Sequence, residues 1–253
     1  NLVKYKNYDV NSRGSVESDG RLQRWTLLGY AILIGEVKPA EKLLQLGADV
    51  NSVSFDGGAI SSNIGQACSL KNKEMIDLLL QYKVNLNSPL DNSPIDELLT
   101  VNANKSLIEK LLEHGANINH QDYIDGSTPI KTALNTYKFD YVHYFLDKGA
   151  APLLLDTHGN SLAFLVQEEI NGGRLSDYGL KEYTKLKERL INEFYVQYPL
   201  KRESRKGMEM AIARYENLSN QDKELLGEKE IERIKKWKEN LEKGVNIFGK
   251  PLE

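Results

Sequence analysis

Apolar residues recur along the chain at the spacing of amphipathic helices. In residues 75–80 and 107–112 they fall three or four positions apart, which places them on one helical face. The same spacing runs from Tyr183 to Tyr198 and predicts a long helix that ends at Pro199. Around Met208 and Trp237 it predicts a short helix and a last charged helix. Helices therefore dominate the predicted structure.

The helices in the first two thirds of the chain belong to a recurring unit. Four segments end alike, at 43–51, 79–87, 111–119 and 145–152, and their equivalent positions 47, 83, 115 and 149 are 36, 32 and 34 residues apart. Upstream of each lies a run that opens with Ser or Thr, at 26–31, 62–67, 93–98 and 128–133, with a fainter fifth at 161–165. A hydroxyl at the start of such a run caps a helix. The pattern predicts two helices per unit.

These runs and their period resemble the ankyrin-repeat family, whose repeat is about 33 residues long. The resemblance covers residues 24–152 and fades in the fifth run. It implies an all-α ankyrin-repeat solenoid of four repeats plus a degenerate fifth, in which stacking buries the apolar faces. The chain departs from the family at its helix-opening histidine, which is replaced by Gly29, Gly65, Asp96 and Lys131. Lys83 stands where the other repeats have a helix-ending glycine, so we expect about 1 kcal/mol of strain there.

The expected domains follow from where the repeat begins and ends. Residues 1–23 are polar and are interpreted as an irregular N-terminal arm, residues 24–173 as the ankyrin-repeat domain, and residues 174–253 as a C-terminal helical extension. A terminal repeat needs a cap with a polar outer face, so the extension is expected to cover the last repeat around Phe164 and Leu165. A second binding surface is the alternative.

Composition and charge exclude several classes of partner. The chain is 40% hydrophobic and 27% charged with a net charge of −3, and residues 1–173 hold 15 Lys and Arg against 21 Asp and Glu. The acidic charge of residues 1–173 argues against a nucleic-acid partner, and no apolar run is long enough for a membrane span. One cysteine, Cys68, permits no internal disulfide. Since the chain starts at Asn1, a removed leader and the bacterial periplasm, or else the cytoplasm, are the compartments considered.

We expect no enzyme, cofactor, metal or small-molecule substrate. The four histidines show no ligand spacing with one another or with a cysteine. Gly57-Gly58 and Gly172-Gly173 lack the Lys-Ser/Thr of a phosphate loop. Cys68 replaces a small core residue of a first helix and is interpreted as a core filler.

The candidate sites come from the resemblance, which implies that partners bind to the hairpin tips and to the concave helix face. Aromatic residues in turns rich in Asp and Gly are expected to be exposed and to anchor a partner. The alternative is that each folds back on its own repeat. The candidate residues are Phe55, Asp56, Leu90, Asp91, Asp122, Tyr123, Ile124 and Asp125 at the tips, and Asn135 and Thr136 on the inner face. The acidic tips would suit a partner with a basic rim.

The resemblance therefore implies a non-enzymatic protein–protein interaction module. The specific hypothesis, by family analogy, is an immunity protein that binds and neutralises a cognate bacterial toxin or secreted effector, including the lipase type. A host-directed effector or a scaffold is one alternative. A regulatory ankyrin fragment of an enzyme is the alternative from another class.

Overall fold

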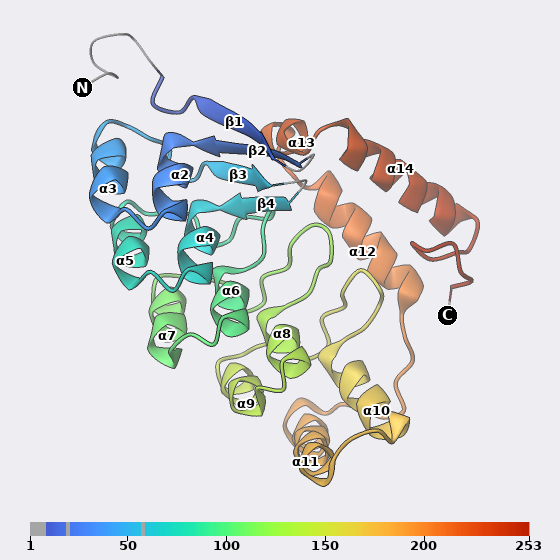
Figure 1. Ribbon diagram of the computed structural model, residues 1–253. Helices are drawn as coiled ribbons and strands as arrows, with labels where there is room; N and C mark the ends of the chain where they lie inside the picture. The colour runs from blue at the N-terminus through green and yellow to red at the C-terminus, as the bar shows by residue number, and fades with distance from the viewer. Residues whose placement is uncertain (1–8, 19–20, 57–58, 253) are drawn as a thin grey trace. The chain divides into compact units, whose positions relative to one another are not determined.

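The computed structural model describes residues 9–18, 21–56 and 59–252 of the 253-residue chain (Figure 1). The chain forms two compact units, Asn1–Asn117 and Ile118–Glu253, hereafter unit 1 and unit 2. Each unit is described by itself.

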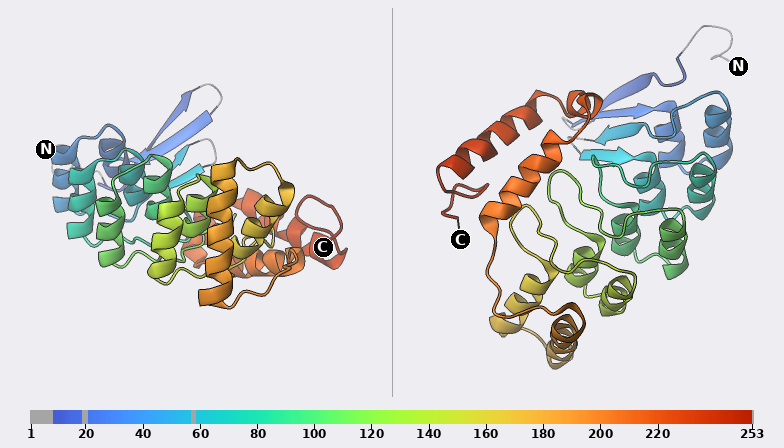
Figure 2. Two further views of the ribbon diagram at one scale, coloured as in Figure 1. Left: turned by 90° about the horizontal axis from the view of Figure 1, so that it is seen from below. Right: turned by 180° about the vertical axis from the view of Figure 1, so that it is seen from behind.

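Unit 1 contains three helix pairs that stack in two rows (Figures 1 and 2). The inner row is α2 (Leu27–Leu33), α4 (Asn63–Ser69) and α6 (Pro94–Thr100), and the outer row is α3 (Val37–Gln45), α5 (Lys73–Gln81) and α7 (Lys105–Glu113). The predicted hydroxyl caps are confirmed at α2 and α4, where Thr26 and Ser62 accept from the backbone N–H groups of Gly29 and Gly65. The two rows bury their facing sides, with Ile32, Ile64, Met75, Ile76, Leu79, Leu98, Ile108 and Leu111 fully inside.

A four-stranded antiparallel sheet extends from the inner row of unit 1. Its strands are β1 (Arg13–Ser18), β2 (Arg21–Thr26), β3 (Val53–Asp56) and β4 (Ala59–Ser62), in the order β1-β2-β3-β4. β2 continues directly into α2, and β4 into α4.

This sheet overturns the predicted all-α class, because the fold is mixed α and β. The stretch 1–23, expected to be irregular, contains β1 and the start of β2. The physical reason is hairpin chemistry. Asp19-Gly20 and Gly57-Gly58 stand between the paired strands in the sequence, and such dipeptides favour two-residue hairpins whose strands satisfy each other's backbone groups.

Unit 2 contains two further helix pairs and a C-terminal block. The pairs are α8 (Pro129–Asn135) with α9 (Phe139–Asp147), and α10 (Leu162–Gly172) with α11 (Asp177–Phe194). The block is α12 (Ser204–Glu216), α13 (Asn220–Leu226) and α14 (Glu228–Glu242). The helix predicted to reach Pro199 ends earlier, at Phe194, where Tyr195 adopts a left-handed conformation. The helix predicted around Met208 is present as α12.

Each helix pair carries two left-handed backbone positions, one between its helices and one after the second helix. The five sets are Gly35 and Gly47, Lys71 and Lys83, Asn102 and Gly115, Tyr137 and Gly149, and Gly173 and Tyr195. The left-handed conformation predicted for Lys83 is confirmed by its φ of 56°. Only glycine adopts this conformation without steric cost, so the non-glycine positions are strained.

Asparagine side chains tie successive repeats together on the outer edge. In unit 1, Asn51 Oδ1 accepts from the backbone N–H of Asn85, and Asn87 Oδ1 accepts from that of Asn117, each at 2.7 Å. In unit 2, Asn119 Oδ1 accepts from the N–H of Ala151 at 2.8 Å. We call these residues the asparagine ladder, and each member satisfies a backbone donor of the next repeat.

Candidate partner-binding surface

Tyr123, proposed as an exposed anchor, is buried within unit 2. Only 3% of it is exposed, and its ring lies 6.4 Å from that of Tyr215 on α12. The guanidinium of Arg233, on α14, lies 5.8 Å from the Tyr123 ring centroid. Burial raises the pKa of the Tyr123 phenol. The expectation that turn chemistry exposes this aromatic is therefore wrong, because the C-terminal block covers the loop.

The other candidate residues of that loop fall into two groups: Asp122 has a structural role, and Ile124 and Asp125 are exposed. Asp122 is buried, and its Oδ1 accepts from the N–H groups of Ile124 and Asp125 at 2.6 and 2.8 Å. Such an Asx turn shapes the loop and leaves little of the carboxylate for a partner. Ile124 and Asp125 themselves are exposed.

Helix α12 is seated on the two loops that precede α8 and α10. A Cβ on Gly207 would lie 2.4 Å from the backbone nitrogen of Gly159, so the two backbones are in direct contact. Arg214 donates to Thr157 Oγ1 at 2.8 Å, with Asp122 and Asp156 close enough to act on its charge. The C-terminal extension predicted over 174–253 therefore packs on unit 2 in two places: α11 lies along α10, and α12 lies on the two loops.

In unit 1 the candidate tip residues Leu90 and Asp91 are also buried. Asp91 Oδ2 accepts from the N–H of Ser62 at 2.6 Å and lies 2.6 Å from where a Cβ on Gly65 would be. The glycine at position 65 thus has a steric reason, because the carboxylate of Asp91 fills the space that a side chain would need. At the equivalent Gly29 the hydroxyl of Ser54 does so, at 2.5 Å.

Lys131, at the corresponding position of unit 2, is 1% exposed, and its ammonium group contacts two partners. Its Nζ lies 3.2 Å from Asp156 Oδ2 and donates to the carbonyl of Asn160 at 3.1 Å. Burial lowers its pKa, and the Asp156 carboxylate opposes that shift. A buried lysine with these partners holds the loop to the helix.

Phe55 is half-buried on β3, on the face of the sheet that also carries Arg24, its cross-strand partner. The guanidinium groups of Arg13 and Arg24 lie 5.0 and 4.8 Å from its ring centroid. Cations therefore flank this aromatic, where acidic neighbours were expected. The side chain of Asp56 lies outside the described residues. On the inner helices, Asn135 is exposed and Thr136 is half-buried, with its Oγ1 donating to the carbonyl of Thr132.

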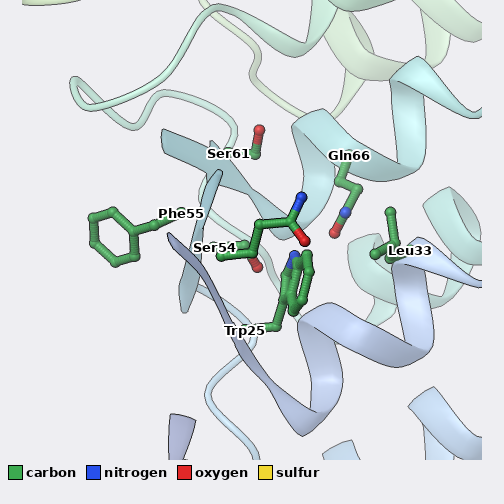
Figure 3. A pocket seen from close by; sticks show the side chains of 7 residues that line it. Trp25, Leu33, Ser54, Phe55, Ser61 and Gln66 are labelled. Atoms are coloured by element: carbon green, nitrogen blue, oxygen red, sulfur yellow. The ribbon is translucent and has the colours of Figure 1, made fainter. Parts of the chain in front are cut away.

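The opposite face of the sheet lines a cavity that the sequence did not reveal. It lies between β2, β3, β4 and the helices α2 and α4, and its volume is about 230 Å³ (Figure 3). The lining residues are Gln23, Trp25, Leu33, Ser54, Phe55, Ser61 and Gln66. Figure 3 shows the side chains of Trp25, Leu33 and Gln66 turned toward the cavity and the ring of Phe55 turned away. We call this cavity the α2–α4 hollow.

The alternation of β2 and β3 explains this lining. Successive side chains of a strand point to opposite faces, so Trp25 and Ser54 face the helices while Arg24 and Phe55 face away. Ser54 is paired with Ser61 across β3 and β4, which places both hydroxyls on the hollow's side. The signal that could have indicated a strand beside the hollow is the alternation of apolar and polar residues in 53–56.

Exposed apolar side chains lie on α2 and α4, the two helices that border the hollow. Tyr30 is 50% exposed on α2, and its ring lies 6.3 Å from that of Trp25. Leu33, which lines the hollow, and Ile34, the C-cap of α2, are also exposed, and so is Leu70, the C-cap of α4. Large apolar groups left in contact with water at one place mark an interaction surface.

Two polar atoms of the hollow lack hydrogen-bond partners among the described residues. They are Ser54 Oγ and Gln66 Oε1, and both are inaccessible to solvent. Ser54 is 4% exposed as a whole. A buried polar atom without a partner costs roughly 1–3 kcal/mol, so these two atoms lower the stability of unit 1.

The described residues offer no alternative centre for metal chemistry, since they contain no group of three His, Cys, Asp or Glu side chains placed to hold an ion. Cys68 is fully buried, in agreement with its interpretation as a core residue, and burial raises the pKa of its thiol. Among the same residues, no helix is long and apolar enough to cross a membrane. No known protein-family model matches the chain.

Proposed function

We propose that the chain is a non-enzymatic protein-binding module of the ankyrin-repeat type, and that its partner binds at the α2–α4 hollow and the apolar residues beside it. The observation that carries the proposal is the presence of the exposed apolar residues Tyr30, Leu33, Ile34 and Leu70 on the two helices that border a preformed cavity. Aromatic and aliphatic side chains around a pocket are the usual centre of a protein interface.

The distribution of buried residues supports unit 1 as the binding unit. In unit 2 the aromatic tip residue Tyr123 is already covered by α12 and α14. In unit 1 the side chain of Tyr30 has half of its surface in water. The helix pairs with their paired left-handed positions support the ankyrin-repeat type, since such units expose an inner helix face.

The test is capture of a partner by immobilised chain, with identification by mass spectrometry and affinity by surface plasmon resonance. Tyr30→Ala should weaken binding at least about tenfold, which corresponds to about 1.4 kcal/mol for a central aromatic. Tyr178→Ala is the matched control, because Tyr178 is also an exposed helical tyrosine but lies in unit 2. A partner that binds the Tyr30→Ala variant as tightly as the wild type would contradict the proposal.

The finer hypothesis, neutralisation of a bacterial toxin or secreted effector, stays a prediction. It is tested by co-expression with a toxic neighbouring gene product in bacteria. Under the hypothesis, wild type and Tyr178→Ala restore growth, and Tyr30→Ala does not. Growth arrest that wild type leaves unchanged would reject it while leaving protein binding open.

A further inference from the structure

The face of the sheet that is turned away from the α2–α4 hollow carries two cations beside one aromatic ring. Directly opposed residues of paired strands point to the same face, and the register gives three such pairs, Ser15–Arg24, Arg24–Phe55 and Phe55–Ile60. Arg13 precedes Ser15 by two positions on β1, so it points to this face as well. Arg13, Ser15 and Arg24 are exposed, whereas Phe55 and Ile60 are half-buried. We call these five residues the arginine face.

The two guanidinium groups of the arginine face are held in place before any ligand arrives. They lie 5.0 and 4.8 Å from the centroid of the Phe55 ring, close enough for a cation–π contact. Arg13 also donates from Nη1 to the carbonyl of Val53 at 2.9 Å, which fixes its side chain on the sheet. An arginine that is already ordered loses less conformational entropy when it binds a ligand.

The arginine face concentrates positive charge. Burial, and then the charge of Arg24, lowers the pKa of the Arg13 guanidinium, and Asp49 opposes that shift. Both guanidinium groups nevertheless stay charged at neutral pH. Within the part of the chain that the structure describes, neither Arg13 nor Arg24 takes part in a salt bridge. An anion beside both groups would therefore be attracted by each and would reduce their mutual repulsion.

The chemistry of the arginine face suits a carboxylate on a short apolar stem. A guanidinium group is a planar fork that donates two parallel hydrogen bonds to a carboxylate. The hydroxyl of Ser15, in the same row as Arg24, is a further donor. Phe55 and Ile60 provide apolar surface for methylene groups. A nucleic acid needs an extended basic surface, whereas residues 1–173 hold more acidic than basic side chains.

We propose that the arginine face binds an aspartate or glutamate side chain of an acidic protein segment, with the carboxylate on Arg13 and Arg24 and the stem on Phe55. This inference goes beyond the proposed function, because the arginine face and the hollow lie on opposite sides of the sheet. It assigns the chain a second contact surface, whose partner chemistry is acidic.

The experiment uses the full-length chain and a small probe. A short peptide of alternating alanine and glutamate is titrated into the isotope-labelled protein at low salt, and the backbone N–H signals of Ser15, Arg24 and Phe55 are followed by nuclear magnetic resonance. The same peptide with glutamine in place of glutamate is the matched probe, since it keeps the shape and removes the charge. The glutamate peptide should shift these signals saturably, with an affinity roughly fivefold or more above that of the glutamine peptide.

Variants locate the response. Arg24→Gln should abolish the preference for the glutamate peptide. Arg174→Gln removes the same charge at an exposed arginine of unit 2 and should retain the preference. Circular dichroism establishes that both variants are folded. A deoxythymidylate decamer is titrated as a third probe, because it presents phosphates to the same groups.

Several outcomes would overturn the proposal. Equal affinity for the two peptides in the wild-type chain would do so without reference to any variant. A preference that persists in Arg24→Gln, or that is lost equally in Arg174→Gln, would show that the arginine face is not the site. Tighter binding of the decamer than of the glutamate peptide at these signals would assign the face to nucleic acid.

The two proposals fail separately, because the peptide titration requires no partner at the hollow. If Tyr30→Ala keeps the captured partner while the glutamate peptide binds through Arg24, the interface at the hollow is wrong and the arginine face stands. If Tyr30→Ala loses the partner and the two peptides bind equally, the interface stands and the arginine face is not a carboxylate site.

Discussion

At the scale of single residues, two aromatic side chains with similar sequence surroundings lie in different environments. Phe55 and Tyr123 both stand in turn regions rich in Asp and Gly. Phe55 is half-buried between two guanidinium groups, and Tyr123 is covered by residues more than 90 positions away, including Tyr215. Local turn chemistry predicts exposure only when nothing distant covers the turn. Whether a distant segment covers an aromatic side chain cannot be predicted from the sequence of the turn that carries it.

Tyr123→Ala is therefore expected to change stability. Removing a buried aromatic ring should lower the free energy of unfolding by about 3 kcal/mol, because it leaves a cavity against Tyr215. The measurement is urea denaturation followed by circular dichroism. Ile124→Ala, at the exposed neighbour, should stay within about 0.5 kcal/mol of wild type. Similar midpoints for the two variants would contradict the burial of Tyr123.

Lys83 offers a stabilising substitution. Its φ of 56° lies in the left-handed region, and the equivalent positions in neighbouring repeats are Gly47 and Gly115. Lys83→Gly should raise the free energy of unfolding by up to about 1 kcal/mol, since the strain of a side chain there exceeds the added entropy of glycine. Gly47→Ala is the reciprocal control and should destabilise the chain. A thermal midpoint that falls in Lys83→Gly would show that the lysine makes a compensating contact.

Glu97 is expected to make the free energy of unfolding depend on pH. Burial first, and then Asp91, raises the pKa of its carboxyl above the ordinary 4.5. Between the ordinary and the raised pKa the folded state holds the proton that the unfolded state has released, so this residue's contribution to stability falls as pH rises through that window. Glu97→Gln should therefore be more stable than wild type at pH 7, and the difference should shrink below pH 4.5.

Urea denaturation of wild type and Glu97→Gln at several pH values checks this. The amide keeps a hydrogen-bond acceptor for the side chain of Asn92, so the substitution removes mainly the charge. A stability difference that is independent of pH would show that Glu97 ionises normally in the folded protein.

At the scale of elements, the C-terminal block contacts loops that were expected to bind a partner. Helix α12 approaches the loop before α10 so closely that glycine is required on both sides, at Gly207 and Gly159. The sequence contains these glycines but nothing that pairs them, because they are 48 positions apart. Helices α11, α12 and α14 were largely predictable from apolar spacing, whereas the break at Gly227 that separates α13 from α14, and the docking of α12, were not.

Gly207→Ala tests that docking. The added methyl group would meet the backbone nitrogen of Gly159, so α12 must shift and the chain should lose about 1–3 kcal/mol of stability. Gly172→Ala is the matched control, since a Cβ there meets nothing within 4 Å and alanine favours the helix. Hydrogen exchange should report faster exchange in residues 153–160 for Gly207→Ala alone. Unchanged exchange would mean that α12 does not hold that loop.

The strands were the elements that sequence reasoning missed. The repeat period drew attention to helices, and β3 and β4 are only four residues long. The pairing of Ser54 with Ser61 shows which side chains share a face, and the sequence alone does not give that pairing. The exposed side of that sheet and the hollow behind it could not be separated without knowing the strand register.

At the scale of the whole molecule, the helix pairs were predictable and the α2–α4 hollow was not. The helix pairs follow from caps and apolar spacing, which are local properties. The all-α class was wrong because the inserted sheet depends on pairing between segments such as β2 and β3, about 30 residues apart. Of the predicted partner-binding residues, Leu90, Asp91, Asp122 and Tyr123 are buried, and the hollow contains only Phe55 from the predicted set.

The asparagine ladder has a consequence for the chemical ageing of the protein. An asparagine deamidates when the following backbone nitrogen attacks its side-chain carbonyl carbon, and Asn51-Ser52 and Asn87-Ser88 are sequences with a small second residue. In the folded chain the side chain of Asn87 is held from both ends, because Oδ1 accepts from Asn117 and Nδ2 donates to the carbonyl of Gly115. Attack requires that side chain to turn, and it turns only when the neighbouring repeat separates. In a population of molecules, the fraction modified at Asn87 is thus expected to grow with the time that the repeats spend apart, and this fraction measures how readily the array opens.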